Sequence, residues 1–388
     1  MRYPATVAAL VVPFLFGCTD PSAPNARATN GAPRPLAAYD DDNLGAESEF
    51  SSPDVRFSFV VIGCNRVDKA DTNSTTNPST ANQDALLRAF SEIAAMRPLP
   101  RFVFFAGDMV YGYTPTLADT VRLELQLRSW LALYQASPLA ATDVELVPLE
   151  GNHEVQNSKK IAFPAGERTW LRVMGAHIPR AGNGPAAGGP DNLATDQSLL
   201  TYSFDYARTH FVLVNTDPVG KDGSVPLNWI ASDLAAAQAN HVKHVFIITH
   251  KPAYAYPIAS YIPPLTQEDG LGGTYPLERD ALWGMLADAN AEAMLSAHNH
   301  LYFRTQGAVG ATWQVVAGNG GSPIEPIIDR ENQSWFGYSV VTVHRNNQVT
   351  LTSYAHQVPT AGYLTSSAGY PTVIRDEADI TWPGPGGS

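Results

Sequence analysis

Cysteine is almost absent from this chain, since only Cys18 and Cys64 occur among 388 residues. At most one disulfide is available, so the fold must be stabilised by its hydrophobic core. Positive charge is also scarce, with 25 Lys and Arg against 37 Asp and Glu, and the basic residues form no run. Nucleic acids and anionic membranes attract proteins through cationic surfaces. The composition therefore excludes a general nucleic-acid or membrane-surface binder.

Long hydrophobic runs are missing as well, because no segment beyond the N-terminus reaches the ~18 to 20 apolar residues of a transmembrane helix. Residues 1–18 combine Arg2, a short apolar stretch and a final Leu-Phe-Gly-Cys. This pattern predicts a secretory signal. Its ending resembles a bacterial lipobox, which predicts a lipoprotein-type signal peptide with lipidation of Cys18; because Phe16 is unusual there, cleavage at an ordinary signal-peptidase site is the alternative. Both predict export, to the bacterial periplasm or cell surface. If Cys18 is lipidated, the predicted membrane contact is through that lipid anchor alone.

Composition divides the remaining chain into three parts. Residues 19–55 are rich in Pro, Ala, Asn and Asp and predict a flexible tether. Residues 56–357 carry regular hydrophobic patterns and form the predicted domain, and residues 358–388 are predicted to be a C-terminal tail. No feature of the sequence indicates an oligomeric state.

Buried strands and amphipathic helices alternate through the domain. Short apolar runs typical of strands are residues 56–63, 101–107, 145–149, 200–206, 210–215, 243–249, 293–297, 301–305, 312–317, 338–343 and 349–354. Helical spacing of apolar residues occurs at 82–96, 117–135, 227–239 and 277–289. Parallel strands need crossover helices. The order predicts an α/β fold, a four-layer α/β/β/α sandwich of two mixed sheets with the helices outside.

Polar side chains of the kind that bind metals follow four of these strands. They are Asp108, Asn152, His250, and the pair His298 and His300. Open α/β sheets place their ligand crevices at the carboxyl ends of strands, so these residues are expected to meet. If the His-x-His segment continues its strand, both imidazoles project to the same side. Carboxylate, amide and imidazole ligands suit Zn, Mn or Fe alike.

These motifs resemble the calcineurin-like metallophosphoesterase superfamily, and within it the purple acid phosphatase-like branch. The matching motifs are Gly-Asp-x-x-Tyr at Asp108 and Tyr111, Gly-Asn-His-Glu at Asn152, His153 and Glu154, a single histidine at His250, and Gly-His-x-His at His298 and His300 with Ala297 in place of Gly. The resemblance covers roughly residues 56–357. It implies a metallophosphoesterase-like fold and an exported hydrolase of small-molecule phosphoesters.

The resemblance also implies a role for each matching residue. Asp108 would bridge two metal ions. Asn152, His250 and His298 would complete one metal site, and His300 would belong to the other. His153 would protonate the leaving alkoxide or steady the phosphoryl oxygens while metal-activated water attacks phosphorus. Apart from the resemblance, Tyr111 and Asn65 are expected to contact substrate because they stand next to motif residues, and Glu154 either orients His153 or lies on the surface.

The first motif departs from the family pattern. Members end the first strand with Gly-Asp-x-His or Gly-Asp-x-Gly, whereas this chain has Gly63-Cys64-Asn65-Arg66. Arg66 could replace one cation and bind phosphate beside a single metal. Alternatively, Cys64 could ligate a second metal as a thiolate, or Asp68 or Asp71 could supply the missing carboxylate.

One or two metal ions per chain are therefore expected. A further alternative is a site that has lost catalysis, in which Cys64 is inert and Arg66 forms a structural ion pair with Asp108 or Glu154. The protein would then be a phosphatase-fold binding protein that retains one metal.

Overall fold

The structure is a computed structural model that describes residues 49–113, 120–179, 182–255, 270–307, 309–324 and 334–383. All of these residues belong to the unit Pro33–Ser388. The predicted signal peptide and most of the predicted tether lie outside the described residues. Among the described helices, none has the length and apolar character needed to cross a bilayer.

The first sheet contains six strands in the order β12-β11-β10-β1-β2-β3. Their bounds are β1 (Val55–Ile62), β2 (Phe102–Ala106), β3 (Glu145–Leu149), β10 (Trp335–His344), β11 (Val349–Gln357) and β12 (Val373–Asp379). Strands β1, β2 and β3 run parallel, while β10, β11 and β12 form antiparallel pairs from β1 outward. This sheet is mixed, as the sequence predicts.

The second sheet also contains six strands, in the order β4-β5-β6-β7-β9-β8. Their bounds are β4 (Tyr202–Tyr206), β5 (Thr209–Val214), β6 (His244–Thr249), β7 (Ala293–Ser296), β8 (Tyr302–Gln306) and β9 (Trp313–Ala317). Neighbouring strands from β5 to β9 pair in parallel, whereas the two edge strands β4 and β8 are antiparallel to their neighbours.

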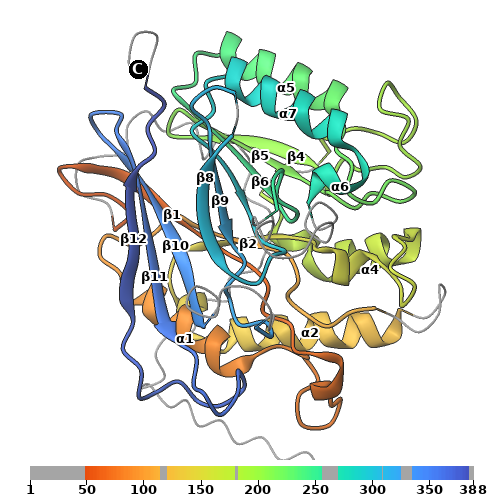
Figure 1. Ribbon diagram of the computed structural model, residues 1–388, viewed down its shortest axis with the longest axis vertical. Helices are drawn as coiled ribbons and strands as arrows, with labels where there is room; N and C mark the ends of the chain where they lie inside the picture. Colours follow the sequence, from red (N-terminus) through yellow and green to blue (C-terminus); the bar gives the residue numbers. More distant parts are fainter. Residues whose placement is uncertain are drawn as a thin grey trace, which may run out of the picture. The chain divides into compact units, whose positions relative to one another are not determined.

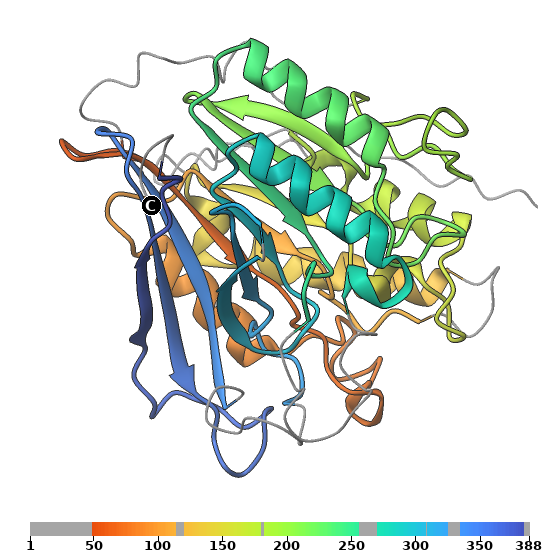
Figure 2. The same cartoon turned by 45° about the horizontal axis from the view of Figure 1, so that its top comes forward.

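Helices cover the outer face of each sheet (Figures 1 and 2). The longer ones are α1 (Gln83–Ala94), α2 (Val121–Gln135), α4 (Pro164–Met174), α5 (Leu227–Ala239) and α7 (Pro276–Asp288). Short helical turns are η2 (Lys69–Asp71), η3 (Pro138–Ala141), α3 (Asn152–Val155), η4 (Gly175–His177) and α6 (Leu271–Thr274). Apolar side chains of α1, α2 and α4 pack against the first sheet, and those of α5 and α7 against the second. The predicted four-layer architecture is confirmed.

Aromatic side chains fill the space between the two sheets. Phe59 of the first sheet lies 5.1 Å, between ring centroids, from both Phe211 and Phe246 of the second. Phe102 and Phe204 make a similar contact across the sheets at 5.5 Å. Edge-to-face aromatic pairs contribute about 0.5–1.5 kcal/mol beyond the burial of their area. This layer fixes the two sheets against each other, and with them the loops at their carboxyl ends.

The predicted C-terminal tail was wrong for part of its length. Strand β12 lies beyond residue 357, pairs with β11, and is followed by the fully buried Ile380. Its sequence, VIRDEAD, lacks the alternation of apolar residues that marks a half-buried strand. An edge strand of this kind is held by backbone pairing and ion pairs, such as Asp376 with Arg304 at 2.9 Å. Helix α4 was also not predicted from the sequence.

Candidate metal centre and phosphate site

The predicted site residues lie in loops at the carboxyl ends of β1, β2, β3, β6 and β7. Several of these loops turn through the left-handed backbone region, with φ of 58° at Cys64, 55° at Asp108 and 64° at His298. Non-glycine residues rarely adopt this conformation, and such strain often occurs at functional sites. Gly151 is also required, because a Cβ atom there would lie 2.4 Å from Asp108 Oδ1. The backbone is thus shaped to bring polar side chains together.

Four donor side chains converge at one point. His250 Nε2 lies 3.2 Å from Asp108 Oδ1, 3.0 Å from Asn152 Oδ1 and 3.2 Å from His298 Nδ1. His298 Nδ1 also lies 3.1 Å from Asn152 Oδ1. Asp108, His250 and His298 form one of the described groups that could hold a metal ion. The sequence prediction that these four residues meet is supported by these distances.

The neighbours of this group fix which atoms face inward. His250 Nδ1 lies 2.7 Å from the carbonyl oxygen of Ala106, which requires a proton on Nδ1 and leaves a lone pair on Nε2 in the neutral ring. Asn152 donates its amide Nδ2–H to Tyr113 Oη at 2.7 Å, so its oxygen points at the histidines. A neutral ring nitrogen, an amide oxygen and a carboxylate oxygen therefore face one another as acceptors. A bound cation would satisfy all three, so the residues present fit a metal ion.

The charges of this group follow from burial. Burial disfavours the Asp108 carboxylate, but the nearby His250, His153 and Arg66 together hold its pKa well below its usual range. Burial and the adjacent His250 lower the pKa of His298 well below its ordinary value. Burial also opposes protonation of His250, yet the Asp108 carboxylate outweighs it and raises the pKa of that ring. An ionised Asp108 and a neutral His298 are the states that bind a metal.

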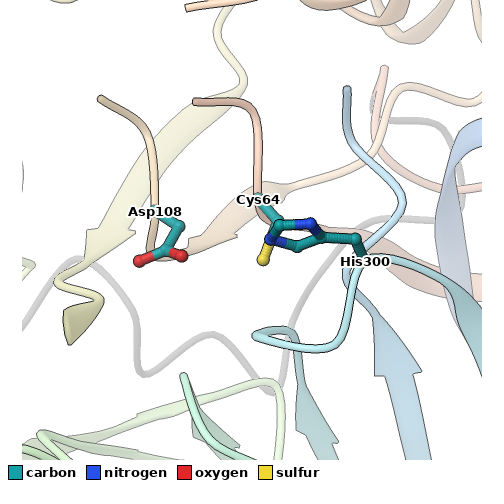
Figure 3. A group of neighbouring side chains, drawn as sticks. All are labelled: Cys64, Asp108 and His300. Carbon is teal, nitrogen blue, oxygen red and sulfur yellow. The ribbon is translucent and has the colours of Figure 1, made fainter. Parts of the chain in front are cut away.

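A second group of donors shares Asp108. The ligand atoms of Cys64, Asp108 and His300 all lie within 4.8 Å of one another, and Figure 3 shows the three side chains approaching from separate segments. Cys64 is fully buried, and its Sγ accepts the backbone N–H of His298 at 3.1 Å. Burial, with the negative charge of Asp108, raises the pKa of the Cys64 thiol well above its ordinary value. Because its pKa is raised, the Cys64 side chain is an uncharged thiol rather than a thiolate.

Arg66 lies against two members of this second group. Its Nη2 is 3.5 Å from His300 Nε2, and its Nε is 3.9 Å from Asp108 Oδ2. His300 Nδ1 lies 2.8 Å from the carbonyl oxygen of Pro323, so Nδ1 carries the proton and Nε2 a lone pair in the neutral ring. Burial and Arg66 lower the pKa of His300 to about 4. The guanidinium thus places a permanent positive charge beside the shared carboxylate.

His153 lies near the same carboxylate oxygen of Asp108 as Arg66 does. Its Nδ1 is 2.5 Å from the carbonyl oxygen of Tyr111, its ring packs on Tyr113 with centroids 3.9 Å apart, and its Nε2 lies 3.9 Å from Asp108 Oδ2. Burial lowers the pKa of His153 to about 3. The ring is therefore neutral at pH 7, with its Nδ1 proton directed to Tyr111 and a lone pair on Nε2. To donate a proton, Nε2 must first acquire one.

A polar cavity of about 280 Å³ opens beside these groups. The predicted residues among its lining are Arg66, Asp68, Asp108, Tyr111, Asn152, His153, His298 and His300. Sequence reasoning did not assign Tyr113, Lys160 or Asn299 to the site, although they line the cavity too. Tyr113 stands two residues after the Tyr of the second motif, which was the only available signal. No feature of the sequence pointed to Lys160 or Asn299.

Of the two predicted substrate-contacting residues Asn65 and Tyr111, Asn65 does not fit that role. Asn65 is fully buried, is absent from the cavity lining, and donates its Nδ2 hydrogens to the carbonyl oxygens of Asn82 and Gly320 at 3.1 and 2.8 Å. It ties backbone segments together rather than contacting a ligand. Tyr111 does line the cavity, and its backbone N–H donates to Thr80 Oγ1 at 2.8 Å.

Both roles considered for Glu154 were wrong. The side chain is fully buried, and no described hydrogen bond joins it to His153. Instead, Oε2 accepts the backbone N–H groups of Asp108 and Gly151 at 3.0 and 2.8 Å, and Oε1 accepts that of Val110 at 3.1 Å. Glu154 therefore binds the loops after β2 and β3 to each other.

Neither loop carboxylate considered as a substitute ligand joins the metal-donor atoms, although Asp68 lines the cavity. Asp71 accepts the hydroxyl proton of Tyr363 at 2.5 Å, and Asp68 Oδ1 accepts the N–H of Lys69 at 2.6 Å. Neither belongs to a group of described residues that could hold a metal. His298 and His300 do not continue strand β7, which ends at Ser296, so the strand-alternation argument was wrong. The two rings instead join different donor groups.

The fold and site together define a class of protein: an α/β sandwich with a group of side chains that could hold a metal ion, beside a polar cavity whose lining includes the cations Arg66 and Lys160. The chain belongs to the calcineurin-like phosphoesterase family, whose sequence model matches residues 58–302. The predicted resemblance is thereby confirmed.

Individual relatives place the chain near the purple acid phosphatase branch. It is 24% identical to purple acid phosphatase 21 of Arabidopsis thaliana over 40% of this chain and 30% of that protein. It is 26% identical to purple acid phosphatase 22 of the same plant, over 43% of this chain and 32% of that protein. The chain thus matches about a third of the length of these relatives.

A solved structure has a similar fold. The purple acid phosphatase PPD1 from seeds of yellow lupin (Lupinus luteus) is similar with a TM-score of 0.52 and 17% identity, covering 83% of this chain and 53% of that one. At this identity the likeness concerns the fold alone.

Proposed function

We propose that this protein is a metal-dependent phosphoester hydrolase, with Asp108, Asn152, His250 and His298 holding a metal ion. The observation that carries the proposal is the convergence of four potential metal-ligand atoms, all between 3.0 and 3.2 Å from a neighbour in the group, beside a cavity whose lining includes an arginine. The family membership supports the same reaction class. Small-molecule phosphoesters are the proposed substrates.

In this reaction water adds to phosphorus, the ester P–O bond breaks, and an alcohol leaves. A metal bound at the donor group would supply Lewis-acid stabilisation of the phosphoryl charge and lower the pKa of water. Hard oxygen and imidazole ligands suit Zn, Mn or Fe. The contribution of the protein is to hold these ligands in place around the buried carboxylate of Asp108.

His153 is proposed to assist the leaving group. Its Nδ1–H is directed to the carbonyl oxygen of Tyr111, so only Nε2 is available to exchange a proton with a ligand. A negatively charged phosphoester in the cavity would favour the imidazolium form, because a nearby anion raises the pKa of a histidine. The protonated Nε2 could then pass its proton to the departing alkoxide.

The test is hydrolysis of an aryl phosphate monoester and an aryl phosphate diester by the full chain, loaded separately with zinc, manganese and iron. His250→Ala should lose both bound metal and turnover. His344→Ala is the matched control, because that histidine bonds Thr350 Oγ1 at 2.9 Å at the end of β10 and is absent from the cavity lining. A wild-type protein that binds metal and hydrolyses neither ester would favour the alternative, a binding protein that retains one metal.

Export and lipid anchoring at Cys18 are also proposed, on the basis of the sequence of residues 1–18. Expression of the full gene in a bacterial host tests both. Radiolabelled palmitate should appear in the wild-type protein and disappear in Cys18→Ala. A labelled Cys18→Ala protein would contradict the anchor, and cytoplasmic retention of the wild type would contradict export.

A further inference from the structure

The donor group formed by Cys64, Asp108 and His300 differs chemically from the first. Asp108 is its only carboxylate, and it is shared with the group that contains His250. Cys64 stands where the family pattern has a second carboxylate. Its Sγ already accepts a backbone N–H and belongs to the apolar cluster between the sheets. Compared with the family pattern, this position has therefore lost one negative charge.

A positive side chain lies where that charge has been lost. Arg66 follows the same strand, two residues after Cys64, and its guanidinium approaches both His300 and Asp108, at 3.5 and 3.9 Å. A second metal ion at these donors would face this fixed cation at close range, with one shared carboxylate to offset both. The same contacts place the arginine charge beside the metal group on the cavity wall.

Arg66 is also equipped to bind an anion. Its Nε is buried, and no acceptor in the described part of the chain lies within hydrogen-bond distance of it. A buried donor without a partner is costly, and a ligand oxygen would satisfy it. Arginine offers several N–H groups in a planar fork that matches the oxygens of a phosphate.

We propose that Arg66 replaces the first metal ion of the family: the protein holds one metal, at Asp108, Asn152, His250 and His298, and the Arg66 guanidinium binds the phosphoryl group directly. This inference rests on the proposed function and specifies how the site carries its positive charge. One metal and one guanidinium then neutralise the substrate, where the family pattern implies two metals.

Metal content of the full chain provides the first test. After loading with zinc and removal of excess metal, elemental analysis should find one equivalent per chain in the wild type and in Cys64→Ser, and none in His250→Ala. The cobalt-loaded protein should lack the near-ultraviolet charge-transfer band of a cobalt–thiolate bond. Two equivalents in the wild type, or loss of metal in Cys64→Ser, would overturn the inference while leaving the proposed function intact. No bound metal in the wild type would overturn both.

Phosphate binding provides the second test. Calorimetric titration of the zinc-loaded full chain with inorganic phosphate should show affinity weakened about 10- to 100-fold in Arg66→Ala, the loss expected for charge-assisted hydrogen bonds. Metal content should stay at one equivalent. Arg128→Ala is the matched control, since Arg128 is exposed on α2 and pairs with Glu124. Unchanged phosphate affinity in Arg66→Ala would overturn the inference.

A variant that restores the family motif tests whether Cys64 and Arg66 are the reason for the single metal ion. The double variant Cys64→Asp with Arg66→His restores the first motif of the family and should bind two zinc equivalents per chain. A folded double variant that still binds one would overturn the assignment of the difference to these two residues. If this variant does not fold, the wild-type metal count and the Arg66→Ala phosphate titration still decide the question.

Discussion

Removing the Glu154 carboxylate should destabilise the protein strongly, although the side chain contacts neither the cavity nor the predicted ligand atoms. Glu154 is fully buried and accepts three backbone N–H groups, two through Oε2 and one through Oε1. Glu154→Ala leaves all three donors buried without partners. At about 1–3 kcal/mol for each unsatisfied buried donor, the free energy of unfolding should fall by about 3–6 kcal/mol, allowing for partial relaxation of the loops.

Glu154→Gln separates this effect from loss of packing. The glutamine oxygen can take the position of Oε2 and keep the bonds from Asp108 and Gly151, while its NH2 group would face the N–H of Val110. One bond of three is lost, so a decrease of about 1–3 kcal/mol is expected. The two variants should therefore rank in the order wild type, Gln, Ala.

Urea unfolding at pH 7, followed by tryptophan fluorescence and by circular dichroism, measures these differences on metal-free protein. Metal-free conditions matter because bound metal would add its own stabilisation. Glu377→Gln serves as the control, since Glu377 is an exposed carboxylate on the edge strand β12, and its effect should stay within about 0.5 kcal/mol. Equal stability of Glu154→Ala and the wild type would refute the reasoning, as would a Gln variant as unstable as the Ala variant.

Three further outcomes are expected. Tyr113→Phe keeps the ring that packs on His153 but removes the hydroxyl that accepts the amide N–H of Asn152. Zinc affinity, measured against a competing chelator, should fall about 10-fold. Unchanged affinity would contradict the proposal that Tyr113 orients Asn152. His210 bonds Asp205 and Asp233 at 2.6 and 2.9 Å; burial opposes its charge, but these carboxylates raise its pKa to about 9. The stabilisation by the charged His210 is complete below about pH 6.5 and is lost as the pH rises through about 9. The free energy of unfolding should fall by about 1–2 kcal/mol over this range, a value reduced for solvent screening because Asp205 is half exposed. Urea midpoints that stay equal across this range, or that fall equally in His210→Asn, would contradict this role of His210. Chelation of a metal present at 100 times its dissociation constant should lower stability by about 2.7 kcal/mol, reversibly on reloading, and a thermal midpoint indifferent to chelator would argue against the metal site.

The strand pattern of the domain could be predicted because it is local. Runs such as residues 56–63 and 101–107 are almost wholly apolar, and strands buried on both faces have that composition. Strand β12 and helix α4 were not predicted, because no local pattern in the sequence marked them. The former is a charged edge strand whose place depends on pairing with β11, and pairing partners far away in the sequence leave no periodicity in the strand itself.

The donor group was predicted from the order of its motifs, whereas its supporting residues were not. Asp108, Asn152 and His250 each follow a strand, and parallel strands bring their carboxyl ends together. Glu154 and Tyr113 support these residues through hydrogen bonds between loops. Their roles depend on how neighbouring loops pack, so sequence position gave the wrong role for Glu154 and none for Tyr113.

By itself, the amino-acid sequence determined the alternation of strands and helices and the loops that carry carboxylate, amide and imidazole groups, because hydrophobic periodicity and residue chemistry act over short distances along the chain. Only the tertiary structure decided which of those groups face one another. In the structure His298 and His300 belong to two different donor groups, and the guanidinium of Arg66 lies near the carboxylate of Asp108. Contacts of this kind depend on the packing of two sheets and on the backbone turns at Cys64, Asp108 and His298, which join residues far apart in the chain and so leave no local pattern in the sequence.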